Sequence, residues 1–199
     1  YRAYRDSKQL VRPPTRTPQG FWLAGNAAMQ SGTFEPVETE VVTGLLAEVD
    51  VLLNIGANIG YYCCLALMQR KQVAAFEPMP NNLMLLMRNL QRNGWEQDVE
   101  IFPMALSSHI GITHIYGGGT GASLVKGWAG QSDQHVTSVS TSTLDILLGD
   151  RFLGRRCLIV VDIEGAELAM LQGASKMLHA TPKPIWMVEV SITEHQPAG

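Results

Sequence analysis

The sequence has little of what marks a secreted, disulfide-stabilised or membrane protein. It holds 3 cysteines in 199 residues, and two of them, Cys63 and Cys64, are adjacent, which gives neither a disulfide framework nor a metal-ligand spacing. No apolar run reaches the roughly 18 residues that a membrane span needs, and no signal peptide is visible. We therefore expect a cytoplasmic protein without a membrane span, and we assign no metal site.

Charge is also scarce, and it is unevenly placed. Charged residues make up 17% of the chain against 46% hydrophobic residues, a balance that supports one packed domain. The net charge is −3, although residues 1–20 hold five Lys or Arg and one Asp. This balance argues against a nucleic-acid partner. We expect an N-terminal arm and lead-in segment over residues 1–37, either solvated or packed against a second copy in a homodimer, and a ligand-binding domain over 38–199.

Hydrophobic periodicity predicts an alternation of strands and helices after residue 37. Short apolar runs predict strands at 50–56, 72–76, 99–102, 157–161 and 185–188, and those at 50–56 and 157–161 are expected to be buried. Apolar residues at helical spacing predict helices at 38–49, 57–69, 80–93, 144–152 and 165–179. Residues 107–143 predict short antiparallel strands and a loop, 116–130, that can close over a site and whose Trp128 favours contact with a bound group. The order implies an α/β fold with a doubly wound, mostly parallel sheet.

Polar side chains stand at the ends of four of the expected strands: Asn54, Glu77, Asp162 and Glu189. A buried parallel strand has no structural need to finish in a carboxylate. Ligands of doubly wound sheets bind at the carboxyl ends of the strands, close to the point where the strand order reverses. These residues therefore indicate a ligand site at that edge of the sheet.

The turn after the first strand indicates a nucleoside cofactor. Gly56 permits a tight turn, Gly60 permits close approach of the next helix, and the helix N-terminus offers unpaired N–H groups. A dinucleotide fingerprint needs glycine at position 58, where this chain has Asn58. Glu77, at the end of the second strand, is placed to accept hydrogen bonds from ribose hydroxyls. Both NAD and S-adenosylmethionine carry that ribose, and Asn58 favours S-adenosylmethionine.

A second acidic motif follows the fourth strand. Asp162 and Glu164 either contact a ligand (the cofactor ammonium group, a substrate hydroxyl or a divalent cation) or cap the next helix. Both alternatives stay open for these two residues. Glu167 lies in the first helical turn, where interaction with the helix dipole explains it.

Several of these motifs match one known family in order. Its turn Asp-x-Gly-Ala-Asn-x-Gly is matched by residues 54–60, with Asn54 in place of Asp, and its Phe-Glu-Pro-x-Pro by residues 76–80. Its Asp-x-Glu-Gly-Ala-Glu is matched by residues 162–167. Further matches are residues 32–36, Asn89, Asn93, Thr143-Leu144-Asp145 and Glu189. In these features the chain resembles the FkbM-type S-adenosylmethionine-dependent methyltransferases.

The resemblance implies a class I methyltransferase fold, S-adenosylmethionine as cofactor, and methylation of a hydroxyl oxygen on a sugar or other small metabolite. The cofactor contacts that it implies are Asn54, Gly56, Ala57, Asn58, Gly60, Glu77, Pro78, Met104, Ala105 and Asp162. Two positions depart from the family: Asn54 lacks the charge of Asp, and Val160 stands where many relatives carry Lys. The fold continues after its fifth strand with a helix and an antiparallel hairpin, so we expect a C-terminal edge that is incomplete.

A hydroxyl acceptor benefits from a general base. The candidate catalytic residues are Asp162, Glu164 and His195, and Glu189 and His135 are further candidates. Two other readings stay open. One is an NAD(P)-dependent oxidoreductase, which Asn58 disfavours, and the other is a binding module with a degenerate site, which Asn54 and Val160 keep open.

Overall fold

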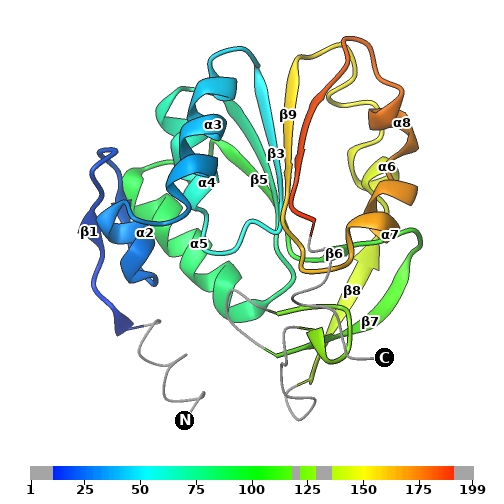
Figure 1. The fold of residues 1–199 in the computed structure, drawn as a ribbon, viewed down its shortest axis with the longest axis horizontal. Coiled ribbons are helices and arrows are strands. Elements are labelled where there is room, and N and C mark those ends of the chain that lie inside the picture. Colours follow the sequence, from blue (N-terminus) through cyan, green and yellow to red (C-terminus); the bar gives the residue numbers. More distant parts are fainter. Residues whose placement is uncertain (1–10, 118–121, 129–135, 191–199) are drawn as a thin grey trace.

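The centre of the computed structural model is a parallel sheet of five strands. The structure describes residues 11–117, 122–128 and 136–190, so the candidate bases His135 and His195 lie outside the described residues. The strands are β3 (Val51–Ile55), β4 (Gln72–Phe76), β5 (Val99–Phe102), β9 (Cys157–Val161) and β10 (Ile185–Val188). They lie in the order β10-β9-β3-β4-β5, and all neighbours are parallel (Figure 1). The predicted α/β fold and its strands are confirmed.

Helices cover both faces of this sheet because successive residues of a buried strand point to opposite sides. One layer holds α3 (Pro36–Leu46), α4 (Tyr61–Met68) and α5 (Pro80–Asn93), and the other holds α6 (Leu144–Leu148), α7 (Glu167–Gln172) and α8 (Ser175–Leu178) (Figure 1). Along β3, Leu52 packs in the first layer, whereas Val51 and Leu53 pack in the second. Within the described ranges no helix has the length and apolar character to cross a bilayer.

The strand order reverses between β3 and β9. The chain runs outward from β3 through β4 to β5 and then returns to β9 on the other side of β3. Asn54 lies beside Val160 and Ile55 beside Val161 in the register of this pair. The expectation that the fourth predicted strand lies beside the first is therefore confirmed. Their carboxyl ends form the switch point at which ligands of such sheets bind.

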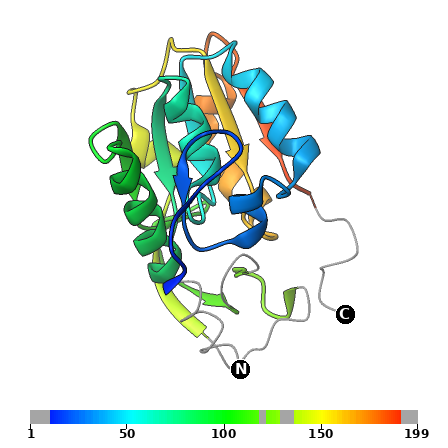
Figure 2. The same ribbon diagram turned by 90° about the vertical axis from the view of Figure 1, so that its left-hand side faces the viewer.

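The chain before α3 packs on the outer side of the helical layer that contains α5. β1 (Thr15–Arg16) pairs with β2 (Trp22–Leu23), and α2 (Ala27–Ser31) follows. Figure 2 shows this segment, in blue, lying across the face between α5 and α3. Asn89 exchanges hydrogen bonds with the backbone N–H and C=O of Ala24, and Asn93 does the same with Trp22. The side chains of the two motif asparagines therefore pair with backbone N–H and C=O groups of the N-terminal segment, as the backbone of a neighbouring strand would.

A small second sheet lies at the carboxyl end of the central sheet (Figure 1). It consists of β6 (Ala105–Leu106), β7 (Gly111–Tyr116) and β8 (Val136–Ser142) in the order β6-β8-β7. β7 and β8 are antiparallel, whereas β6 and β8 are parallel. The prediction of short antiparallel strands over residues 107–143 is thus confirmed for β7 and β8.

The structure differs from the sequence prediction at several helices. The helix predicted at 38–49 spans Pro36–Leu46, and the helix predicted at 144–152 ends at Leu148. The helix predicted at 165–179 is divided between α7 and α8, with the break at Gly173. The backbone oxygen of Ser107 approaches this break so closely that a Cβ on Gly173 would lie 2.2 Å from it. The helix predicted from Ala57 begins at Tyr61. Asn58 and Gly60 before it have φ of +51° and +89°, which a right-handed helix does not admit.

Candidate cofactor site

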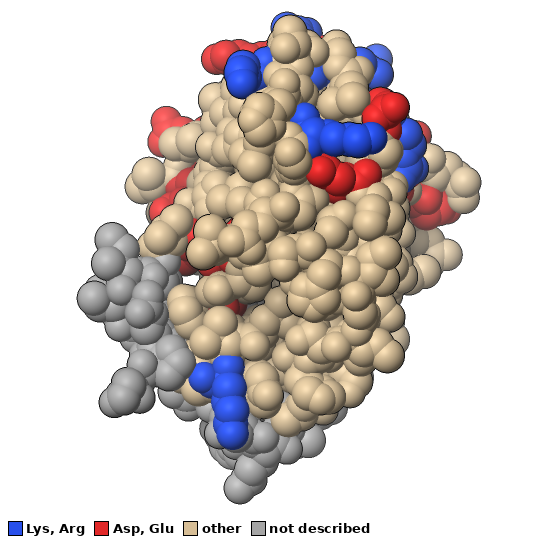
Figure 3. All heavy atoms as spheres, turned by 90° about the vertical axis from the view of Figure 1, so that its right-hand side faces the viewer, with Lys and Arg blue, Asp and Glu red and all other residues tan. Residues whose placement is uncertain are grey.

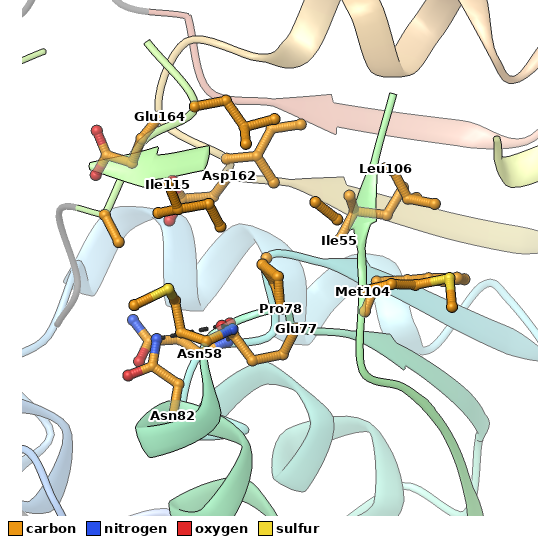
Figure 4. Close-up of a pocket in the computed structure, with 17 residues that line it drawn as sticks. Ile55, Asn58, Glu77, Pro78, Asn82, Met104, Leu106, Ile115, Asp162 and Glu164 are labelled. Carbon is orange, nitrogen blue, oxygen red and sulfur yellow. Dashed lines mark hydrogen bonds between the residues drawn. The ribbon is translucent and has the colours of Figure 1, made fainter. Parts of the chain in front are cut away.

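A cavity lies at the carboxyl ends of β3, β4 and β9, beside the small sheet (Figure 4). The sequence-predicted residues that line it are Gly56, Asn58, Glu77, Pro78, Met104, Ala105, Asp162 and Glu164. Asn54, Ala57 and Gly60 are not among its lining residues. Leu106, next to Ala105, also lines it, and so do Ala122 and Leu124 of the loop that the sequence predicts at 116–130. Sequence reasoning missed Met79, Asn82 and Ile115, which line it as well. Ile115 is an apolar residue with no motif around it, so only its position in space marks it.

The turn after β3 packs directly against the end of β9. Gly56 has φ of +84°, and a Cβ on it would lie 1.8 Å from the backbone oxygen of Asp162. Gly60 has φ of +89°, and a Cβ on it would lie 2.4 Å from Cδ1 of Leu86 on α5. Both positions therefore require glycine for conformation and for space. The sequence predicted that both glycines allow a close approach to the backbone. In the structure, the neighbours of Gly56 and Gly60 are Asp162 and Leu86 of the protein itself.

Glu77 is the most buried carboxylate of the cavity wall, with 3% of its surface exposed. Its Oε2 accepts a hydrogen bond from the backbone N–H of Asn58 at 2.7 Å. Its Oε1 accepts from the backbone N–H of Met79 at 2.8 Å and from Nδ2 of Asn82 at 3.4 Å. Burial raises the pKa of Glu77 from 4.5 to about 7, although the three donors act in the opposite direction. The carboxylate thus ties the turn after β3 to the end of β4.

Asn54 lies within β3 and is 2% exposed. Its Nδ2 donates to Sγ of Cys63 on α4 at 3.3 Å, so its side chain belongs to the helical layer rather than to the cavity wall. Asn54 and Val160 are register partners on adjacent strands, and Val160 packs in the same layer. The two departures from the family pattern therefore lie side by side. A neutral pair at this buried place carries none of the desolvation cost of an ion pair.

Four carboxylates converge beside the cavity, and we call Glu35, Asp162, Glu164 and Glu189 the acidic group. Burial raises the pKa of Asp162, and a hydrogen bond with Glu189 and the charges of Glu164 and Glu35 raise it further. Acidic side chains are visible inside a hollow of the molecular surface (Figure 3). Among the described residues, no set of three or more His, Cys, Asp and Glu side chains is arranged to hold a metal ion. A carboxyl whose pKa is raised in this way is typical of residues that exchange protons at active sites.

Glu35 is a member of the acidic group that sequence reasoning missed. It precedes α3 with φ of +38°, and its Oε2 accepts a hydrogen bond from the Tyr62 hydroxyl at 2.8 Å. Burial raises the pKa of Glu35, Tyr62 lowers it, and the neighbouring carboxylates of Glu189 and Glu164 raise it again. The signal in the sequence was the lead-in match over residues 32–36, which contains this glutamate.

Other residues of the family motifs form hydrogen bonds that stabilise the backbone outside the cavity. Oγ1 of Thr143 accepts the backbone N–H of Ile146 at 3.1 Å and caps α6. Asp145 accepts the backbone N–H of Lys176 at 3.0 Å, at the start of α8. Oε1 of Glu167 accepts the backbone N–H of Gly165 at 3.0 Å. The family motifs therefore mark backbone supports as well as residues of the cavity.

Comparison with known proteins gives the family. Residues 54–197 match the model described as the methyltransferase FkbM domain. The chain is similar to the structure of methyltransferase FkbM from Methylobacillus flagellatus KT, at 14% identity and a TM-score of 0.47 over 94% of this chain and 47% of that one. It is also similar to an O-methyltransferase from Bacillus cereus in complex with SAH, at 14% identity and a TM-score of 0.43 over 75% of this chain and 55% of that one. The chain spans about half the length of these two structures. No curated protein matches the sequence.

The family match contains all the residues that line the cavity. It includes the turn at 54–60, Glu77 and the motif at 162–167, and a methyltransferase family agrees with the predicted cofactor, S-adenosylmethionine. Glu35 lies before the matched residues, although the fold brings it to the same acidic group. The chain belongs to the FkbM methyltransferase family.

Proposed function

We propose that this chain transfers the methyl group of S-adenosylmethionine to a hydroxyl oxygen of a sugar or another small metabolite. The observation that carries the proposal is that Glu77 and Asp162, which follow two different strands, line one cavity at the switch point of the sheet. Glu77 suits a nucleoside, and Asp162 suits proton exchange with an acceptor.

The residues of the cavity fit S-adenosylmethionine by their chemistry. A carboxylate has about four acceptor positions, of which the Glu77 carboxylate uses three for Asn58, Met79 and Asn82, so one remains for a ribose hydroxyl. Met104, Ala105 and Leu106 supply an apolar wall suited to adenine. The turn at Gly56 and Asn58 offers polar backbone for the amino-acid moiety. We propose these as the cofactor contacts.

In the proposed reaction, the bound cofactor supplies an electrophilic methyl group on a sulfonium centre. The protein aligns the acceptor oxygen with that methyl group and keeps water away. Asp162 accepts the proton of the acceptor hydroxyl on its carboxylate. Because the pKa of Asp162 is raised, methyl transfer is expected to increase with pH through the range in which this carboxyl ionises.

Calorimetric titration with S-adenosylhomocysteine and with NAD tests the cofactor. We expect S-adenosylhomocysteine to bind with a dissociation constant on the order of micromolar, and NAD not to bind. Glu77→Ala is expected to weaken S-adenosylhomocysteine binding by at least about tenfold, because a charged acceptor is lost. Glu48→Ala is the matched control, since Glu48 is exposed and lies outside the cavity. Unchanged affinity in Glu77→Ala would remove Glu77 from the cofactor site.

Transfer of a labelled methyl group to a panel of sugars and small hydroxylated metabolites tests the reaction. Asp162→Asn is expected to retain S-adenosylhomocysteine binding and to lose methyl transfer, because the amide cannot accept the hydroxyl proton. Full methyl transfer by this variant would exclude Asp162 as the base. Binding of cofactor without transfer to any acceptor by the natural chain would favour a binding module.

A further inference from the structure

One wall of the cavity comes from a short segment between β7 and β8. We call residues 122–128 the strap. Ala122 and Leu124 of the strap line the cavity, together with Ile115 of β7. Between them, Ser123 forms a backbone bridge with Tyr116, so the strap extends the small sheet toward the cavity.

The strap is fastened to Glu164 at two points. The Ser123 hydroxyl donates a hydrogen bond to the backbone oxygen of Glu164, and the Trp128 Nε1–H donates to Oε2 of Glu164 at 2.6 Å. Both donors are buried, with 1% of Ser123 and 5% of Trp128 exposed. A hydrogen bond to a carboxylate away from water is among the stronger ones in proteins. Glu164, in the segment that follows β9, therefore binds the strap near both of its ends.

The backbone after β9 is shaped to receive the strap. A Cβ on Gly165 would lie 2.6 Å from Cζ3 of Trp128, so the indole ring packs on a backbone that only glycine leaves open. Glu164 and Gly165 both have positive φ, at +55° and +96°. Residues held in such conformations persist where the surrounding contacts determine them. Trp128 thus packs against protein, on Gly165, and it is not among the residues that line the cavity.

The Glu164 side chain also points away from the proposed cofactor contacts. Figure 4 shows the Glu164 carboxylate pointing away from Glu77 and Met104, which stand on the far side of the cavity. One of its oxygens accepts the Trp128 indole N–H. A general base must instead present its carboxylate to the acceptor proton.

We propose that Glu164 is a positioning residue that anchors the strap over the cavity, and that this anchor sets the rate at which the cofactor leaves. The inference rests on the proposed function, because S-adenosylmethionine and its product are taken to fill this cavity. Ala122 and Leu124 then lie against the bound cofactor, and release requires the strap to move. Glu164 has no part in proton transfer in this arrangement, which leaves that role to Asp162.

The test measures dissociation of S-adenosylhomocysteine from the full chain by stopped-flow displacement with excess S-adenosylmethionine. Trp128→Phe keeps a ring on Gly165 but removes the donor, and Glu164→Ala removes the acceptor, so both are expected to speed release by about tenfold or more. Glu164→Gln keeps an acceptor oxygen for the indole N–H and is expected to keep most of the slow release. Trp22→Phe is the matched control, because Trp22 is 36% exposed on β2 and lies outside the cavity.

The outcomes separate the inference from the proposed function. If the natural chain does not bind S-adenosylhomocysteine, the proposed function fails and the inference fails with it. If it binds and Trp128→Phe releases it at the natural rate, the inference alone is overturned. It is also overturned if Glu164→Gln releases as fast as Glu164→Ala. Melting of the unliganded variants shows whether each is folded, and if Glu164→Ala is not, Trp128→Phe and Glu164→Gln decide the matter.

Discussion

The two sides of the cavity hold their carboxylates in opposite ways. On the side of β4, the Glu77 carboxylate is surrounded by donors, and its three hydrogen bonds join the turn after β3 to the start of α5. On the side of β9, Asp162 is surrounded by other carboxylates, which raise its pKa together with burial. The hydrogen bonds of Glu77 order the backbone around the cavity. The grouping of carboxylates around Asp162 costs stability, which indicates a role in the reaction instead of in folding.

Gly56 is the point at which the two sides meet, and Gly56→Ala is expected to have the largest effect. The added Cβ would lie 1.8 Å from the backbone oxygen of Asp162 on a backbone with φ of +84°. Overpacking and backbone strain together should lower the free energy of unfolding by about 3–5 kcal/mol. Urea denaturation measures this change.

Gly94→Ala is the control for the Gly56 variant. Gly94 has φ of +73° after α5, but a Cβ there meets nothing within 4 Å. Gly94→Ala should lower the free energy of unfolding only by the penalty for a left-handed backbone at a residue with a Cβ, about 1–2 kcal/mol. Equal losses of unfolding free energy in Gly56→Ala and Gly94→Ala would mean that the close contact between the turn after β3 and the end of β9 adds nothing to the cost of the Gly56 variant.

The pH dependence of stability tests the burial of Glu77. Its pKa is raised from 4.5 to about 7 in the folded chain, so its stabilising contribution is present below pH 4.5 and is lost as pH rises toward 7. The change corresponds to about 3 kcal/mol in the free energy of unfolding of the unliganded protein. Glu77→Gln is expected to remove this part of the pH dependence, as measured by urea denaturation across the range. The same slope in both proteins would show that folding does not raise the pKa of Glu77.

The neutral pair Asn54 and Val160 can be tested by introducing the charged residues that the family carries at these two positions. Asn54→Asp puts a carboxylate beside Cys63 in the buried layer and is expected to cost about 2 kcal/mol. Val160→Lys alone should also be destabilising. Because Asn54 and Val160 are register partners, the double variant should be at least about 1 kcal/mol more stable than the sum of the single changes. Additive losses would show that the two departures are independent.

Removal of one charge from the acidic group should have the smallest effect and the opposite sign. Burial, a hydrogen bond with Glu189 and the charges of Glu164 and Glu35 raise the pKa of Asp162, so at pH 8 folding must protonate a carboxyl that is ionised in the unfolded chain. Asp162→Asn removes this requirement, and we expect a gain of about 1 kcal/mol in the free energy of unfolding at pH 8. The gain should fall at lower pH, where Asp162 is protonated in the unfolded chain as well. Asp98→Asn, at an exposed position, is the control. A loss of stability in Asp162→Asn would mean that its carboxylate, like that of Glu77, is held by donors.

Much of the fold was predictable because local patterns determine it. The parallel strands of this sheet are short, mostly apolar runs, so β4, β5 and β9 were predicted at their observed bounds. The same patterns failed at Gly173, because nothing local shows that Ser107 approaches this glycine from another element. The site divides in the same way. Glu77 and Asp162 were found because they end strands, whereas Glu35 comes to the acidic group only through the packing of α3 beside α4.

The sequence by itself determined the order of strands and helices, the switch point, the family and its cofactor. These follow from hydrophobic period and from motifs of a few adjacent residues. Tertiary structure alone decided that Asn54 faces Val160 and Cys63 instead of the cavity, and that Trp128 packs on Gly165. It also decided that Glu164 holds the strap. The physical reason is that burial, charge repulsion and hydrogen bonding depend on which distant residues meet in space, and spacing along the chain does not contain that information.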